Sequence, residues 1–189
     1  MSPARPRPGW VDDVLLWHVY PLGFAGAERT LAEHGTDRVS HRLGRVTGWL
    51  DYLLRLGANG LLLGPVFTST SHGYDTLDHY RVDPRLGDEE DLLTLLREAR
   101  ARGVRVVLDG VFNHLSQDHE IVRRATAPGA TDEERSWVRW VGEHTRGFEG
   151  NLDLVELDLT RPVVQDHVVD VMSHWLAVGF DGWRLDAAF

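Results

Sequence analysis

Residues 104–114 read VRVVLDGVFNH, an apolar run that closes on Asp109, Asn113 and His114. A strand that is apolar on both faces is typical of a parallel sheet covered by helices. Polar residues at its carboxyl end matter, because parallel sheets carry their ligands beyond the carboxyl ends of the strands. The stretch therefore predicts an α/β fold with a candidate site along one rim of the sheet.

The same alternation extends along the chain in both directions. Further strands are predicted at residues 14–24, 60–67 and 180–188, and helices at 45–57, 89–103 and 163–179. Residues 68–88 read as a polar loop, and the polar stretch after the third strand holds a short helix near 132–142. In the helix at 45–57 the apolar residues fall mostly on one face, which predicts their burial: Val46, Trp49, Leu50, Leu53, Leu54 and Leu56.

Two architectures accommodate strands and helices in this order. A doubly wound sheet usually has a glycine-rich phosphate loop after its first strand, and residues 19–27 (VYPLGFAGA) contain no GxGxxG. A (β/α)8 TIM barrel instead carries its chemistry at the carboxyl ends of its strands. The pattern favours the barrel, of which this chain would supply the first four strands with a short insert after the third.

Composition narrows the class of ligand. The 189 residues include 29 acids against 20 bases, a formal net charge of −9, and this balance argues against nucleic acid as a partner. There is no cysteine, so disulfides and thiolate chemistry are excluded. No apolar run approaches the roughly 20 residues of a membrane helix, and no signal-peptide core is visible, so we expect no membrane partner and a cytoplasmic location. Residues 1–13 read as a flexible tail.

Arg184 and Asp186 lie two residues apart on the fourth strand, so their side chains share one face. A guanidinium beside a carboxylate favours its ionised form and fixes its orientation, as a nucleophile requires. If the sheet order follows the chain, Asp109 on the third strand reaches Arg184. A structural ion pair is the commoner outcome of this spacing, and both interpretations remain open on these residues alone.

The loops beyond the strands add ligand-binding groups. His114 is placed to hydrogen-bond a ligand hydroxyl, and Tyr74 and Tyr80, in SHGYDTLDHYRVDP (71–84), offer rings for the C–H face of a sugar. The alternatives are a structural histidine and a loop that only packs over the sheet. All of these residues converge on the carboxyl ends of the strands.

These stretches together resemble the α-amylase family of glycoside hydrolases. DGVFNH (109–114) is similar to the family signature Asp-x-x-x-Asn-His of the third strand. GFDGWRLDAA (179–188) is similar to Gly-x-Arg-x-Asp of the fourth, and GYDTLDHYRVDPRLG (73–87) looks like the loop after the second. The resemblance covers nearly all of the chain from about residue 14.

The resemblance implies roles for the residues on that rim. Asp186 would be the nucleophile of a retaining mechanism, and Arg184 would orient it and keep it charged. His114 would bind a sugar hydroxyl, Tyr74 would stack on that sugar, and Asp109 would support them. The substrate would be an α-glucan or malto-oligosaccharide.

No cofactor is expected, and no metal ligands are assigned. In many relatives the asparagine of the first signature, here Asn113, helps to bind a structural calcium. Its other ligands come from a variable loop and cannot be identified in this sequence. Two positions depart from the family pattern: Ser71 stands where many oligosaccharide-specific relatives have an acid, and Asp158 stands where relatives commonly have asparagine.

The expected domain is the N-terminal half of a catalytic barrel, residues 14–189, with a small insert at about 115–154. A retaining glycosidase needs a second carboxyl group as general acid, which in the family follows the fifth strand. We therefore expect this chain to be inactive alone, and its open sheet edges predict self-association or pairing with a missing C-terminal half. The alternative is a non-catalytic carbohydrate-binding or interaction remnant.

Overall fold

A four-stranded parallel sheet is the centre of the structure, a computed structural model that describes residues 7–188. Its strands are β1 (Leu16–Val19), β2 (Gly60–Leu63), β5 (Arg105–Val111) and β11 (Gly182–Asp186), hydrogen-bonded in that order. The predicted sheet order, which follows the chain, is confirmed. Because the strands are parallel and in chain order, their carboxyl ends share one rim.

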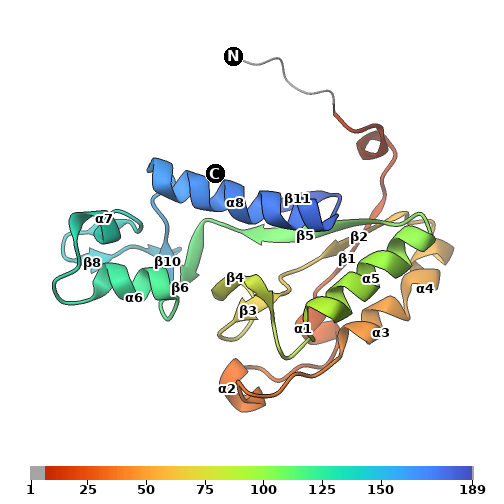
Figure 1. The fold of residues 1–189 in the computed structure, drawn as a ribbon, viewed down its shortest axis with the longest axis horizontal. Helices are drawn as coiled ribbons and strands as arrows, with labels where there is room; N and C mark the ends of the chain where they lie inside the picture. The colour runs from red at the N-terminus through yellow and green to blue at the C-terminus, as the bar shows by residue number, and fades with distance from the viewer. Residues whose placement is uncertain (1–6, 189) are drawn as a thin grey trace.

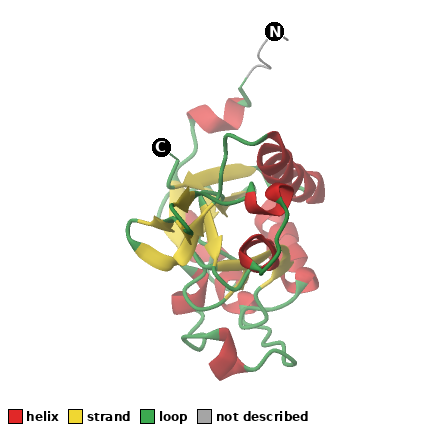
Figure 2. Ribbon diagram, turned by 90° about the vertical axis from the view of Figure 1, so that its left-hand side faces the viewer, coloured by secondary structure: helices red, strands yellow, loops and turns green. Residues whose placement is uncertain are grey.

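Two long helices cover the sheet where the sequence predicted them (Figure 1). Helix α5 (Glu89–Ala101) begins at a capping box in which Asp88 and Asp91 each accept the other's backbone N–H. Helix α8 (Pro162–Val178) starts with proline, whose missing N–H costs nothing at that position, and ends at Gly179 with φ of 120°. Figure 2 shows the helices gathered mostly on one side of the strands.

The prediction of a single helix at residues 45–57 is wrong. Two short helices stand there, α3 (Leu43–Thr47) and α4 (Leu50–Arg55), separated by Gly48 and Trp49. Glycine is a weak helix former, and Trp49 leaves helical geometry at φ −101° and ψ 0°. The break turns Trp49, Leu54 and Leu56 outward, so they are exposed rather than buried.

The first predicted strand is shorter than expected. Strand β1 ends at Val19 because Pro21 opens the one-turn helix α1 (Pro21–Phe24), and Leu16, at the sheet edge, is exposed. A further one-turn helix, α2, spans Leu31–His34. Residues 1–6 of the expected flexible tail lie outside the described part, while Gly9–Asp12 form the 3-10 turn η1.

The polar segment at residues 68–88 is a β-hairpin rather than an irregular loop. Strand β3 (Phe67–Ser69) pairs antiparallel with β4 (Thr76–Val82). Thr76, His79 and Val82 of β4 are buried at every third position, and the register with β3 shifts on either side of Thr68, so the two-residue alternation of a regular strand is interrupted. Its turn holds Tyr74 over the rim of the main sheet.

The insert after β5 is a small unit with its own apolar core (Figure 1, green to light blue). Helix α6 (Glu120–Thr126) packs beside α7 (Asp132–Arg135), which is shorter than the helix predicted near 132–142. The strands are β6 (His114–Ser116), β7 (Trp140–Val141), β8 (His144–Thr145), β9 (Gly147–Phe148) and β10 (Asn151–Glu156). The sheet β6–β10–β9 joins this unit directly to the end of β5.

The main core lies between the sheet and its helices. Leu61, Leu63 and Leu108 of the strands are fully buried there, together with Leu95 of α5 and Trp175 of α8. Within residues 7–188, no helix is long and apolar enough to cross a membrane. The packing supplies the rigid platform on which the rim residues stand.

A buried ion pair joins the two strands and the turn of the hairpin to one another. Asp83 and Arg85 have fully buried side chains, and Arg85 NH2 lies 2.6 Å from Asp83 Oδ2. The guanidinium also donates to the Ser71 carbonyl at 2.6 Å and to Ser69 Oγ at 2.7 Å. Arg85 thus donates to Asp83, to β3 and to the turn, and these direct hydrogen bonds hold the loop that carries Tyr74.

Three histidines meet where the hairpin, the insert and α8 join. His79 donates from Nε2 to the Val111 carbonyl at 3.0 Å, and its ring centroid lies 6.2 Å from that of His167. His119 caps α6 by accepting from the Ile121 N–H. Burial lowers the pKa of His79 to about 3 and that of His119 to about 4, so both are neutral at pH 7.

Arg85→Met should cost about 3–5 kcal/mol of unfolding free energy, because it leaves Asp83 as an unpaired buried charge. Urea denaturation measures the loss. The control is Arg97→Met, which breaks an exposed pair with Glu90 and should cost no more than about 1 kcal/mol. Equal losses in the two variants would contradict the role assigned to Arg85.

Acid should destabilise the protein through His79 and His119. Their pKa values in the folded state lie below the ordinary 6.5, so the unfolded chain binds more protons. The stabilisation is complete above about pH 6.5 and is lost as the pH falls toward 4 and 3, by up to about 1.4 kcal/mol per pH unit for each imidazole. Urea unfolding at a series of pH values should show a shallower slope in the double variant His79→Gln/His119→Asn. The exposed His174→Gln should keep the original slope, and a double variant that also keeps it would contradict this assignment.

Candidate active site

Strands β5 and β11 bring three of the predicted site residues into contact. Asp109 and Arg184 are register partners, and Arg184 NH1 donates to Asp109 Oδ1 at 2.8 Å and to Oδ2 at 3.1 Å. The same nitrogen donates to Asp186 Oδ1 at 2.8 Å. One guanidinium nitrogen therefore joins two carboxylates, and the predicted contact between Asp109 and Arg184 is confirmed.

The two carboxylates differ in their surroundings. The side chain of Asp109 is fully buried, whereas that of Asp186 is 18% exposed. Burial raises the pKa of Asp109, while the hydrogen bonds from Arg184 act in the opposite direction. The hydrogen bonds to Asp109 raise the pKa of Arg184 further, so the guanidinium remains charged. Asp186 is thus the more exposed of the two carboxylates and lies beside a permanent positive charge.

Tyr74 reaches the same group from the hairpin. Its hydroxyl donates to Asp109 Oδ2 at 3.4 Å, and burial, followed by the charge of Asp109, raises its pKa to about 12. The phenol is therefore neutral under all ordinary conditions. Its loop is tightened by the buried Asp75, which accepts from Ser71 Oγ at 2.6 Å and from the Gly73 N–H at 3.2 Å.

His114 is buried rather than free in a loop, contrary to the sequence-based expectation. It opens strand β6, its exposed fraction is 1%, and its Nε2 lies 3.0 Å from the Tyr74 carbonyl. The carbonyl can only accept, so Nε2 carries the proton. Asn113 Nδ2 lies 3.4 Å from His114 Nδ1, and burial lowers the pKa of the imidazole. His114 is thus a neutral donor that joins the hairpin to the end of β5.

Phe148 is a further residue of this site, and no motif in the sequence pointed to it. Its ring stacks on His114 with centroids 4.6 Å apart and planes 21° apart. The preceding Gly147 is required because a Cβ there would collide with the backbone of Asn151. A lone aromatic residue between two glycines, in RGFEG (146–150), was the available signal for a residue at a tight strand crossing.

The residues that could hold a metal ion lie elsewhere. Within residues 7–188, one group of acids and histidines has ligand atoms within 4.8 Å of one another: His41, Asp88 and Asp91. His41 Nδ1 lies 2.6 Å from Asp91 Oδ2, and both aspartates already serve the capping box of α5. The cluster is therefore explained by its role in capping the N-terminus of α5.

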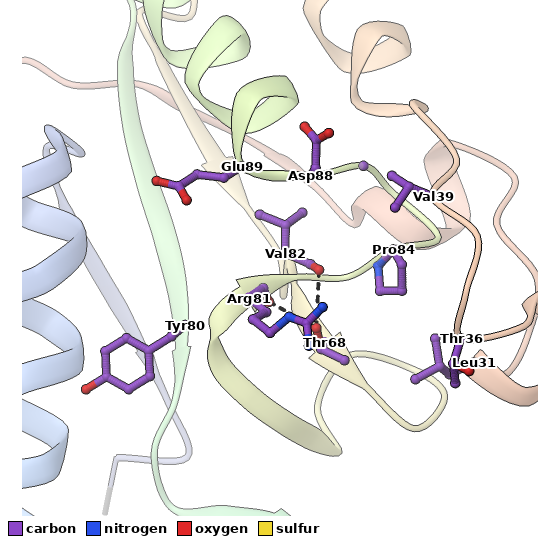
Figure 3. A pocket seen from close by; sticks show the side chains of 11 residues that line it. Leu31, Thr36, Val39, Thr68, Tyr80, Arg81, Val82, Pro84, Asp88 and Glu89 are labelled. Atoms are coloured by element: carbon purple, nitrogen blue, oxygen red, sulfur yellow. Dashed lines mark hydrogen bonds between the residues drawn. The ribbon is translucent and has the colours of Figure 1, made fainter.

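Tyr80, the second tyrosine considered from the sequence, is not part of the rim group. It lines a groove of about 340 Å³ between the hairpin, residues 31–39 and the start of α5, together with Arg81, Asp88 and Glu89 (Figure 3). Tyr74 contacts Asp109 at the rim, whereas the Tyr80 ring packs against His174 of α8. The two tyrosines therefore have different neighbours, although the sequence placed them in one loop.

Comparisons with known proteins identify the family to which the chain is similar. The sequence model described as "Alpha amylase, catalytic domain" matches residues 19–152. "Alpha-amylase 2" of Dictyoglomus thermophilum is 32% identical, over 96% of this chain and 33% of its own length. A cyclomaltodextrinase of Geobacillus thermopakistaniensis is 31% identical, over 96% and 34%. The chain thus spans about a third of the length of these curated relatives.

Solved structures agree at the level of the fold. The cyclic α-maltosyl-(1→6)-maltose hydrolase of Arthrobacter globiformis, in complex with maltose, superposes with a TM-score of 0.80 at 30% identity. The match covers 96% of this chain and 46% of that one. A debranching enzyme of Nostoc punctiforme gives 0.80 at 31% identity, over 96% and 44%. The fold is of the TIM-barrel type, present here in part, and the chain belongs to the α-amylase family.

Proposed function

We propose that this chain supplies the nucleophile half of a retaining glycosidase site that acts on α-glucans or malto-oligosaccharides. The observation that carries the proposal is the shared guanidinium of Arg184, which is fixed by the buried Asp109 and holds Asp186 at 2.8 Å. A structural ion pair would be complete with Asp109 alone. The additional, partly exposed carboxylate is the group that such an arrangement leaves available for chemistry.

In the proposed step, Asp186 attacks the anomeric carbon of the sugar. Arg184 holds Oδ1, so the second oxygen is the one that forms the new bond. The bond from that carbon to the leaving oxygen breaks as the glycosyl ester forms, and the leaving oxygen takes a proton from a general acid. We assign no general acid among these residues, and without one the transfer from a natural glycoside is blocked.

Tyr74 and His114 would shape the place of that sugar. The Tyr74 ring stands beside Asp109 and is only partly buried, so one ring face suits the C–H face of a glucosyl unit. His114 would act chiefly through Tyr74, whose carbonyl it holds at 3.0 Å, because its own ring lies between that carbonyl and Phe148. Asp109 supports the site by fixing Arg184.

The sheet itself favours completion by further strands. Within the described residues, β1 pairs only with β2, and β11 pairs only with β5. Unpaired strand edges readily accept another strand. We infer that a C-terminal half closes the barrel and brings the acid; a second copy of the chain could pair with the open edges but would not supply that acid. The relative named intracellular maltogenic amylase, from Bacillus subtilis, supports a cytoplasmic location.

A substrate with a leaving group that needs no protonation should bypass the missing acid. We expect the 189-residue chain to react slowly with α-maltosyl fluoride and to accumulate a maltosyl ester on Asp186. The ester should persist because its hydrolysis needs the same absent group as a base. Intact-mass and peptide mass spectrometry of the treated protein detect and locate the ester.

Two matched aspartate variants make the measurement decisive. Asp186→Asn should reduce the adduct at least about 10³-fold, because it removes the attacking oxygen. Asp170→Asn alters an exposed acid of α8 and should leave adduct formation unchanged. An adduct on another residue, or none on Asp186 while maltose still binds, would favour the non-catalytic carbohydrate-binding remnant.

A further inference from the structure

Glu156 is a nearly buried carboxylate at the junction between the insert and the barrel. Its side chain is 10% exposed, and it ends β10 opposite His114 of β6. The next residue, Leu157, donates its N–H to the Asn113 carbonyl at 2.9 Å. A carboxylate in this position needs a compensating positive charge, because burial without one is costly.

Two arginines of the insert provide that charge. Arg146 Nε lies 3.1 Å from Glu156 Oε2, and Arg139 NH1 lies 3.8 Å from the same oxygen. The main chain links the same three residues. The Glu156 N–H donates to the Arg146 carbonyl, and the Arg139 N–H donates to the Glu156 carbonyl, each at 2.9 Å. Side chains and main chain therefore close the segment 146–156 into one loop.

Asn113 lines the same cavity, of about 470 Å³, with both arginines and Glu156. This is the asparagine for which the family resemblance implies a structural calcium. Calcium takes six to eight oxygen ligands, several of them usually carboxylates. Here the buried carboxylate is already engaged by a guanidinium and a second one stands beside it, so a divalent cation would meet two positive charges. The residues do not fit a calcium ion.

We propose that Arg146, assisted by Arg139, supplies the positive charge that Glu156 requires, so that the insert is fastened to the barrel without the calcium that the family resemblance implies beside Asn113. The consequence for the site is direct. Phe148 lies inside the loop that the ion pair closes, and it stacks on His114, which holds Tyr74. The ion pair thus positions the insert side of the site.

Thermal unfolding of the full chain, followed by the fluorescence of Trp137 and Trp140 in the insert among the other tryptophans, tests the proposal. The midpoint of the natural sequence should be the same, within about 1 °C, in EDTA and in millimolar calcium chloride. Arg146→Met should lower the midpoint by roughly 5–10 °C, because the substitution leaves the nearly buried Glu156 carboxylate without its nearest positive charge. Arg146→Lys keeps the charge and should retain most of the stability.

Two further variants separate this effect from general damage. Arg123→Met breaks an exposed pair with Asp118 and should leave the midpoint nearly unchanged. Glu156→Gln added to Arg146→Met should recover part of the loss, because the unpaired charge is gone. A midpoint of the natural sequence that falls in EDTA and returns with calcium would overturn the proposal, as would an Arg146→Met midpoint equal to that of Arg123→Met. These readouts are independent of whether the chain transfers glycosyl groups.

Discussion

The candidate site is organised by the hydrogen bonds between Asp109 and Arg184 across two parallel strands. A fully buried carboxylate is tolerated because a guanidinium donates to both of its oxygens, and these bonds give the guanidinium a fixed position at the rim. Asp186, two residues further on the same face, is held by the same nitrogen. A shift of one residue in the β5–β11 register would turn Asp109 to the face opposite Arg184 and break this contact, so the site depends on strand pairing.

The β3–β4 hairpin and the insert are adjacent at this group, where His114 of β6 contacts the Tyr74 carbonyl. The hairpin brings Tyr74, and its loop is held by the buried pair of Asp83 and Arg85. The insert brings Phe148 against His114 through a loop closed by Arg146 and Glu156. Each of the two segments is thus anchored by a buried acid paired with an arginine.

The sequence predicted the parallel sheet, its strand order and the rim group, because buried strands and i, i+2 spacing are local properties. It missed the break at Gly48, where burial of Trp49 was expected from helical periodicity alone. It also missed the hairpin, because the buried residues of β4 recur every third position and two of them, Thr76 and His79, are polar, so the segment lacks the alternation that marks a strand. Phe148 could not be assigned, since its contact with His114 spans 34 residues and depends on how the insert folds.

Binding of maltose, followed residue by residue in solution, distinguishes the rim group from the groove around Tyr80 as the sugar site. In an NMR titration of the 189-residue chain, we expect maltose to shift the side-chain signals of Arg184 and the ring signals of Tyr74. The groove around Tyr80 should remain unperturbed at the same concentrations. Shifts confined to Tyr80 and its neighbours, with Arg184 and Tyr74 unchanged, would contradict the assignment of the rim group as the sugar site.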